Sequence, residues 1–282
     1  MSTSNHHAPI RRILLALDTA AHSLAAVEAA TVLAAHLDAE LHALFVEDIN
    51  LLRLAALPFA RETRLTSATT RSLQNMDMER ALRAEATRAQ ATLATVATRL
   101  NVRWSFQVTR GQVAAQVRAE AMETDLVALT FAGGAPTGLT HVAATIETLM
   151  RGAPCPLLML PPGAGIHPPF VVIYDGSPAS ARALRLAAQL AQAEGQGVTV
   201  LLTANDPPVV WRLRSEAEAQ LAGTNVVAQC SVLLRPDATA IARAVRSASA
   251  GTLLMAADSS VFEGVARRRL LEELDCAALL TR

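Results

Sequence analysis

Two aspartates stand where a carboxylate could do chemistry, each at the end of an apolar run. Asp18 closes ILLALD, and Asp175 closes FVVIYD. Such runs are typical of strands in a parallel sheet that is covered on both faces. Ligands of these sheets bind beyond the carboxyl ends of the strands, but an aspartate there also accepts hydrogen bonds from the exposed amides of a following helix. Each aspartate is therefore either a ligand contact or a helix cap.

A second candidate is the glycine-containing segment Gly133–Gly138 (GGAPTG), which follows the apolar run 126–131. Phosphate binding needs glycine, because the backbone must approach the ligand closely, and free amides at a helix N-terminus. The segment is either such an anion-accepting loop or a plain turn. A Walker-type loop is excluded, since it requires a lysine and all 25 basic residues are arginine.

Cysteine, histidine and serine give weaker indications. Cys155 and Cys276 each precede an apolar run, where a small buried thiol is expected rather than a redox centre. The 7 histidines have no metal-ligand spacing, and neither a nucleophile elbow nor an HExxH motif occurs. These residues predict neither catalysis nor a metal site.

The composition argues against partners that need a strong electric field. The 25 basic residues balance 25 acidic ones, so nothing recruits nucleic acid or an anionic membrane. The apolar runs are strand-sized, far below the ~20 residues that span a bilayer, and the first residues lack the pattern of a signal peptide. Three widely spaced cysteines fit a reducing compartment. We therefore expect a cytoplasmic protein with no nucleic-acid partner and no membrane insertion.

The elements that position these residues repeat within the chain. Ile13–Asp18 resembles Phe170–Asp175 at an offset of 157, and Ala153–Leu160 resembles Asp275–Thr281 at an offset of 121, so the second copy is shorter by 36 residues. Colinear matches of this kind indicate two related copies of one unit. Strands alternating with helices imply right-handed crossovers and a doubly wound parallel sheet.

Apolar runs and helical spacing predict the same order of elements in both copies. In the first copy we expect strands at 13–17, 41–46, 102–108, 126–131 and 156–160, and helices at 23–37, 78–100, 113–123 and 142–151. In the second copy we expect strands at 170–174, 198–203, 226–233, 252–256 and 277–281, and helices at 179–194, 211–221, 238–249 and 261–274.

A proline-rich run divides the chain. PPGAGIHPP, from residue 161, continues neither helix nor sheet, which predicts a domain at 1–160, a linker at 161–168 and a shortened second domain at 169–282. Only the first domain has an insertion, at 49–77. Residues 49–62 suit an amphipathic helix or flap stopped by a proline, and the polar second part is expected to be mobile. The insertion is either a lid on its own domain or a docking surface for a protein.

Three motifs resemble the universal stress protein family in its tandem two-domain form. They are the strand that ends in aspartate before a helix (YDGSPASARAL in the second copy), LFVED at 44–48 and RGAPCPLLML at 151–160. The resemblance implies two tandem α/β domains of the doubly wound, adenine nucleotide alpha hydrolase-like kind. It also implies that the two copies pair through their last strands, as single-domain relatives commonly do. Whether the whole chain also forms a homodimer is left as an alternative.

Many members of this family bind ATP, so the resemblance would place a nucleotide at Asp18, Val46, Thr130, Gly133 and Gly134. The family's glycine pattern falls on Thr130, Gly133, Ala143 and Ala144, and among these only Gly133 matches. In the second copy the loop is shorter by about five residues and its closing pair is Gly264–Val265. Branched or methylated side chains thus stand where a phosphate would approach the main chain.

The departures from the glycine pattern lead to one leading expectation and one alternative. We expect a non-enzymatic tandem universal stress protein with no cofactor, which acts in stress response or regulation through contacts with an unidentified protein, made by residues 49–62. Asp18 and Asp175 are then helix caps. The alternative is an adenine-nucleotide switch that uses ATP at a reshaped site in the first copy.

Overall fold

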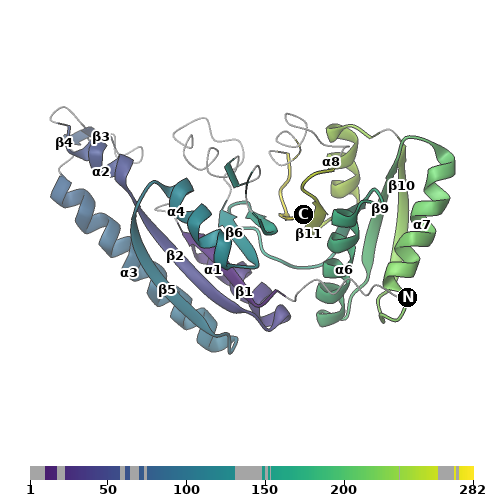
Figure 1. Cartoon of the computed structure of the whole chain (residues 1–282). Coiled ribbons are helices and arrows are strands. Elements are labelled where there is room, and N and C mark those ends of the chain that lie inside the picture. Colours follow the sequence, from purple (N-terminus) through teal and green to yellow (C-terminus); the bar gives the residue numbers. More distant parts are fainter. Residues whose placement is uncertain are drawn as a thin grey trace.

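The computed structural model describes residues 10–17, 23–57, 61–63, 70–72, 75–130, 148–149, 152, 154–234, 236–259, 270 and 273–282. They form one ten-stranded sheet with helices on both faces and a separate two-stranded hairpin (Figure 1). The strand order is β10-β9-β8-β11-β12-β7-β6-β1-β2-β5. The predicted α/β class with a mostly parallel sheet is therefore confirmed.

The first half of the sheet contains five strands in the doubly wound order β7-β6-β1-β2-β5. All its neighbouring strands are parallel. The strands are β1 (Arg12–Leu17), β2 (Glu40–Asp48), β5 (Trp104–Gly111), β6 (Leu126–Thr130) and β7 (Leu157–Leu160). The helices are α1 (Ser23–Leu37), α2 (Ile49–Ala55), α3 (Asn75–Arg99) and α4 (Val113–Glu120), the last followed by the 3-10 turn η1 (Ala121–Glu123).

The second half repeats this order as β12-β11-β8-β9-β10, again with parallel neighbours. The strands are β8 (Phe170–Tyr174), β9 (Val198–Ala204), β10 (Ala228–Leu234), β11 (Thr252–Ala256) and β12 (Ala277–Thr281). The helices are α6 (Pro178–Ala193), α7 (Pro207–Leu221) and α8 (Ala238–Ser247). The predicted helices at 142–151 and 261–274 fall almost wholly outside the described residues.

The two halves have the same strand register as well as the same order. Leu17 lies opposite Phe45 in the first half, and Tyr174 lies opposite Leu202 in the second, which is the offset of 157 found in the sequence. At the last strands, Thr130 pairs with Leu160, and Ala256 pairs with Thr281. A residue of one half can therefore be compared directly with its counterpart in the other.

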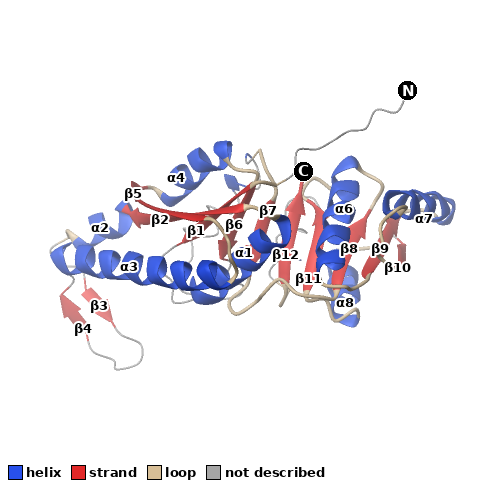
Figure 2. Ribbon diagram, turned by 90° about the horizontal axis from the view of Figure 1, so that it is seen from below, coloured by secondary structure: helices blue, strands red, loops and turns tan. Residues whose placement is uncertain are grey.

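Each face of the sheet is covered by its own set of helices, because the strands are apolar on both sides. Buried residues of α1, α3, α6 and α7 pack on one face, and those of α4 and α8 pack on the other. Figure 2 shows α1, α3 and α6 on the first of these faces, with α3 running roughly along β2 and α6 roughly along β8. Both layers of core run through the two halves.

The halves join at the centre of the sheet, where β7 and β12 pair antiparallel with Leu158 opposite Leu279. The connecting segment after β7 contains no helix or strand, and it docks on the start of β11. There the amide of His167 donates to Thr252 Oγ1 at 3.1 Å, and the same hydroxyl donates to the His167 carbonyl at 2.9 Å. On the face of the sheet that α1 and α6 cover, His36 of α1 lies 3.2 Å from the Glu194 carboxylate at the end of α6.

The insertion forms a short helix and a hairpin at the outer end of the first half (Figure 1). Asp48 caps α2 by accepting a hydrogen bond from the Asn50 amide at 2.8 Å. The helix ends before Pro58, as the sequence predicted. Beyond it, β3 (Arg61–Thr63) pairs antiparallel with β4 (Thr70–Ser72), so the polar second part contains ordered strand pairing that the sequence analysis did not foresee.

Candidate functional site

The carboxyl ends of the strands in the first half are where a ligand of this fold would lie. Of the five predicted site residues, the structure describes Val46 at the end of β2 and Thr130 at the end of β6. Asp18, Gly133 and Gly134 lie outside the described residues.

Val46 is buried, and it lies one residue beyond the last residue of β2 that pairs with β1. In parallel pairing, alternate residues direct both main-chain groups to the same neighbour. Glu40 donates its amide to the Arg11 carbonyl on β1 at 2.8 Å, so even-numbered residues of β2, including Val46, face β1. The last paired residue of β1 is Leu17, opposite Phe45. In this register the Val46 amide faces the Leu17 carbonyl, and the Val46 carbonyl faces beyond Leu17 at the rim of the strand ends.

An ion-pair cluster beside Val46 was not anticipated from the sequence. The carboxylate of Glu47 is nine-tenths buried and accepts from the Arg110 guanidinium at 2.9 Å, and Glu79 of α3 lies 3.4 Å from the same guanidinium. β2 and β5 bring Glu47 and Arg110 together, because the two residues are directly opposite in the ladder. This cluster closes the outer corner of the strand ends with paired charges.

In the second half the Asp175 carboxylate is engaged on both oxygens. Oδ1 accepts from the Ser177 amide at 2.9 Å, and Oδ2 accepts from Ser259 Oγ at 2.7 Å. Burial raises the pKa of Asp175, but the hydrogen bonds from Ser177 and Ser259 outweigh it, so the pKa lies below its ordinary value. Asp175 is therefore held as an anion by groups of its own domain.

The prediction that Asp175 caps the following helix is wrong in its detail. The N-cap of α6 is Ser177, whose side chain accepts from the Ser180 amide at 3.1 Å. Asp175 lies two residues earlier and orders the turn that leads to this cap. The helix begins at Pro178, one residue before the predicted start, and a proline is well tolerated at this first position. Asp18, the counterpart in the first half, lies outside the described residues.

Ser259 is the site residue that the sequence analysis missed. It lies three residues beyond β11 and corresponds in register to Gly133, which lies three residues beyond β6. Its side chain is buried against Asp175. The number of residues between equivalent positions of the two copies is smaller at these strands than at the start of the repeat. A sequence comparison with one constant separation therefore does not align Gly133 with Ser259.

The approach to the main chain after Asp175 is also filled. Gly176 has a positive φ of 81°, and a Cβ there would lie 2.6 Å from Leu213 Cδ2 and 3.3 Å from Glu216 Oε2. At the neighbouring strand ends, Thr203 Oγ1 donates to the Tyr174 carbonyl at 3.3 Å, and Thr281 Oγ1 donates to the Ala179 carbonyl at 2.7 Å. Side chains of this half thus occupy hydrogen-bonding and van der Waals positions that a ligand would need.

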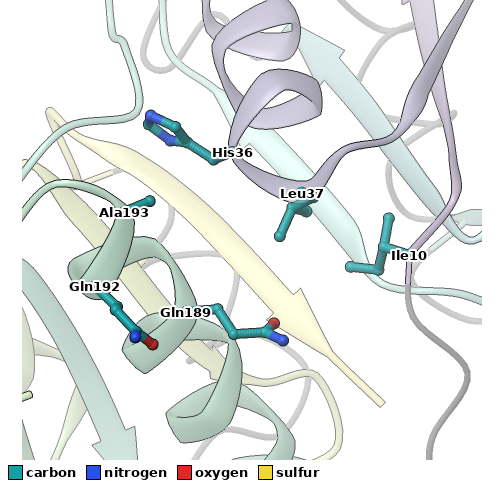
Figure 3. A pocket seen from close by; sticks show the side chains of 6 residues that line it. All are labelled: Ile10, His36, Leu37, Gln189, Gln192 and Ala193. Atoms are coloured by element: carbon teal, nitrogen blue, oxygen red, sulfur yellow. The ribbon is translucent and has the colours of Figure 1, made fainter. Parts of the chain in front are cut away.

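A cavity of about 360 Å³ lies at the opposite, amino edge of the sheet, between the two halves. Figure 3 shows its lining, which comes from the ends of α1 and α6 and from the segment before β1: Ile10, His36, Leu37, Gln189, Gln192 and Ala193. It is remote from the strand ends at which ligands of this fold bind.

Cys155 and Cys276 are free thiols buried among apolar residues. Burial raises the pKa of the Cys155 thiol to about 11 and that of Cys276 to about 11. Thiols of this kind are poor nucleophiles at neutral pH. Within the described ranges, no group of three or more histidine, cysteine, aspartate or glutamate side chains could hold a metal ion. Over the same ranges, no helix is long and apolar enough to cross a membrane.

Comparison with known proteins fits this architecture. The model of the universal stress protein family matches residues 9–161. A universal stress protein from Archaeoglobus fulgidus has a similar structure, with a TM-score of 0.69 at 15% identity, over 96% of this chain and 96% of that one. A putative universal stress protein from Pseudomonas aeruginosa has a TM-score of 0.58 at 16% identity, over 96% and 93%. No curated protein matches the sequence. The chain belongs to the universal stress protein family.

Proposed function

We propose that this universal stress protein is a non-enzymatic regulator in the cytoplasm, which acts through protein contacts and takes up no nucleotide. The observation that carries the proposal is the engagement of Asp175 by Ser177 and Ser259. A ribose or base that used this carboxylate would have to displace a charge-assisted hydrogen bond, worth about 1.5–3 kcal/mol. The second half therefore presents a strand end that is already satisfied by its own residues.

For the first half the support is the residue types at the phosphate positions. Thr130 pairs with Leu160 as the last residue of β6, so a branched side chain stands where the family pattern has glycine. The closing pair of the pattern is Ala143–Ala144, which offers neither a glycine nor a hydroxyl. Each change removes either close approach to the main chain or a hydrogen-bond donor.

The proposed contact region is the α2 surface, defined by Leu54, Leu57 and Met76. Their side chains are 50%, 39% and 63% exposed, and they lie on α2, just after it and in the first turn of α3, which packs against α2. Three large apolar side chains exposed on adjoining elements favour a binding surface. The second half has no counterpart of α2 among its described residues, so the activity would belong to the first half.

The partner role is tested with paired surface variants. Leu54→Arg with Leu57→Arg should abolish the recovery of specific crosslinked proteins from stressed cells, because two charges would stand in the apolar contact. Met122→Arg is the matched control, since Met122 is 68% exposed but lies on η1. Equal recovery with the paired variant and the control would reject the α2 surface as the contact region.

An adenine-nucleotide switch in the first half is the second candidate. It is favoured by the Val46 carbonyl, which faces beyond Leu17, the last described residue of β1, as a hydrogen-bonding contact to a base would require. Such a site would use Asp18, Val46, Thr130, Gly133 and Gly134, with ATP as its ligand.

Isothermal titration calorimetry separates the two candidates. Protein freed of nucleotide by unfolding and refolding is titrated with ATP and with ADP. The leading proposal expects no saturable heat at millimolar nucleotide. Micromolar binding that is lost in Gly133→Arg, with an unchanged circular dichroism spectrum, would establish the switch and reject the non-binding regulator.

A further inference from the structure

One edge of the ten-stranded sheet lacks the features that normally keep edge strands apart. Among the described strands, β10 pairs with β9 alone, and its sequence AQCSVLL carries no charge and no proline over 7 residues. Charged side chains, proline and bulges are the usual protection of an edge strand, which otherwise pairs with another chain. This edge is therefore suited to pairing.

The other edge of the sheet provides an internal comparison. β5 occupies the same register position in the first half, with Val108 equivalent to Val232 and Arg110 equivalent to Leu234. On β5 the charge of Arg110 is present and paired with Glu47. On β10 the equivalent Leu234 is apolar and 51% exposed. The two edges thus differ in charge at matching positions.

The main chain of β10 is oriented to accept a further strand. Val198 of β9 donates its amide to the Val227 carbonyl at 2.9 Å. Since alternate residues of a parallel strand face the same neighbour, residues 227, 229, 231 and 233 face β9. The amides and carbonyls of residues 228, 230, 232 and 234 are therefore directed to the open side.

Helix α7 places an exposed tryptophan beside this edge. Trp211 is 74% exposed, and steps of three and four residues put it on the same flank of α7 as Arg214 and Glu218. The flank of α7 that contains Gln220 faces α6, because Arg185 of α6 donates to the Gln220 side chain at 2.7 Å. The Trp211 flank is therefore on the side of β10, which α7 also contacts. In agreement, burial raises the pKa of the Cys230 thiol, and the charges of Arg214 and Glu218 shift it in opposite directions. Val232, 41% exposed, lies on the same face of the strand as Cys230.

We infer that β10 is the interface for a second copy of this chain, which pairs antiparallel with it about a twofold axis at Cys230. The inference goes beyond the proposed function and does not depend on it. Uncharged strands bring no like charges together in such a pair. Because α7 packs on both β9 and β10, and strands lie about 4.8 Å apart, the two α7 helices would be about 10 Å apart, a normal packing distance.

Charge complementarity favours a second copy of the chain as the occupant. Because α7 connects the parallel strands β9 and β10, it runs against them, so Arg214 lies towards the carboxyl end of β10 and Glu218 lies one turn nearer its amino end. A twofold axis at Cys230 sets Arg214 of one copy against Glu218 of the other, and the reverse. Trp211 of each copy is then covered by the opposite α7, and each Cys230 faces its own symmetry mate.

Sedimentation velocity of the full chain from 1 to about 100 µM tests the dimer. Val232→Lys should give monomer over the range, because two buried lysines would face the same short ladder. Val108→Lys, at the matching position of β5, should dimerise like the wild type. Circular dichroism verifies that both variants fold. A monomeric wild type, or a dimer that survives Val232→Lys, would overturn the inference.

A charge swap and a crosslink test the register. Arg214→Glu and Glu218→Arg should each weaken the dimer at least tenfold, and the double swap should restore it, since opposite charges again face each other. Oxidation with copper phenanthroline should link two wild-type chains by a disulfide between the two Cys230 thiols, because directly opposite residues of an antiparallel pair have Cα atoms about 5.5 Å apart. Cys230→Ser should abolish the link. A double swap no better than the singles, or a crosslink that survives Cys230→Ser, would rule out this arrangement.

Discussion

Removing the Ser259 hydroxyl should destabilise the second half, because this hydroxyl holds one oxygen of the Asp175 carboxylate. The bond is 2.7 Å long, and Ser259 is 3% exposed, so water does not readily replace it. A hydrogen bond to a charged group contributes about 1.5–3 kcal/mol. Asp175 itself is only partly buried. We therefore expect Ser259→Ala to lower the free energy of unfolding by about 2 kcal/mol at pH 7.

The pH dependence of this loss follows from the sign of the pKa shift. The folded pKa of Asp175 lies below its ordinary value of 3.8, so the stabilisation is present above that value and disappears as the pH falls through the folded pKa. The penalty of Ser259→Ala should thus be constant from about pH 5 to 8 and shrink below about pH 4.

Urea denaturation followed by circular dichroism measures the effect, with Ser247→Ala on the exposed side of α8 as the control. In an Asp175→Asn background the same substitution should cost about 1 kcal/mol less, because the bond no longer involves a charge. A penalty of Ser259→Ala no larger than that of the control, or additive single substitutions, would refute the argument that these two side chains close the strand end.

Three further predictions use other parts of the chain. Gly176→Ala should lower the free energy of unfolding, measured by urea denaturation, by about 2–3 kcal/mol, and Gly195→Ala should lower it by about 1 kcal/mol. Both glycines have a positive φ, but only a Cβ at Gly176 would meet another side chain. Burial, and to a lesser extent the charge of Arg12, lowers the pKa of His42 from its ordinary value of 6.5. The free energy of unfolding should therefore fall as the pH drops below 6.5, and an NMR titration should give a pKa of His42 below that value. Maleimide should label Cys155 and Cys276 only after unfolding, since at pH 8 about one thousandth of each is thiolate.

Most of the fold could be predicted from the sequence, because buried parallel strands read as continuous apolar runs. The helix expected at 23–37 and the strands expected at 252–256 and 277–281 have the predicted bounds. Where strands are edges or extend past their neighbours, the bounds differ: β2 and β5 continue to Asp48 and Gly111. Their ends pair through a ladder and an ion pair between distant segments, which a local pattern cannot reveal.

The hairpin of the insertion was missed for a related reason. Arg61–Thr63 and Thr70–Ser72 are short and polar, so they lack the apolar alternation by which strands are predicted. Their pairing depends on each other, with Arg61 opposite Ser72, and a composition rich in serine, threonine and arginine gives no indication of it.

The candidate site was predicted only in part. The aspartate at the end of β8 was identified because it ends an apolar run, but its partners were not. Ser177 caps α6 because Pro178 fixes where the helix begins, and Ser259 meets Asp175 through a loop that crosses from another strand. The contact between Ser259 and Asp175 joins residues 84 positions apart in the chain. It depends on the order of the strands, which the repeat indicated, and on the length of the loop after β11, which the repeat did not indicate.

The most direct test of the account is a native mass spectrum of the full-length protein as it is isolated from its host, without added nucleotide. The account predicts that every charge state has the mass of the polypeptide alone, as a monomer or a dimer. A population heavier by one adenosine phosphate for each chain, lost on unfolding, would contradict it.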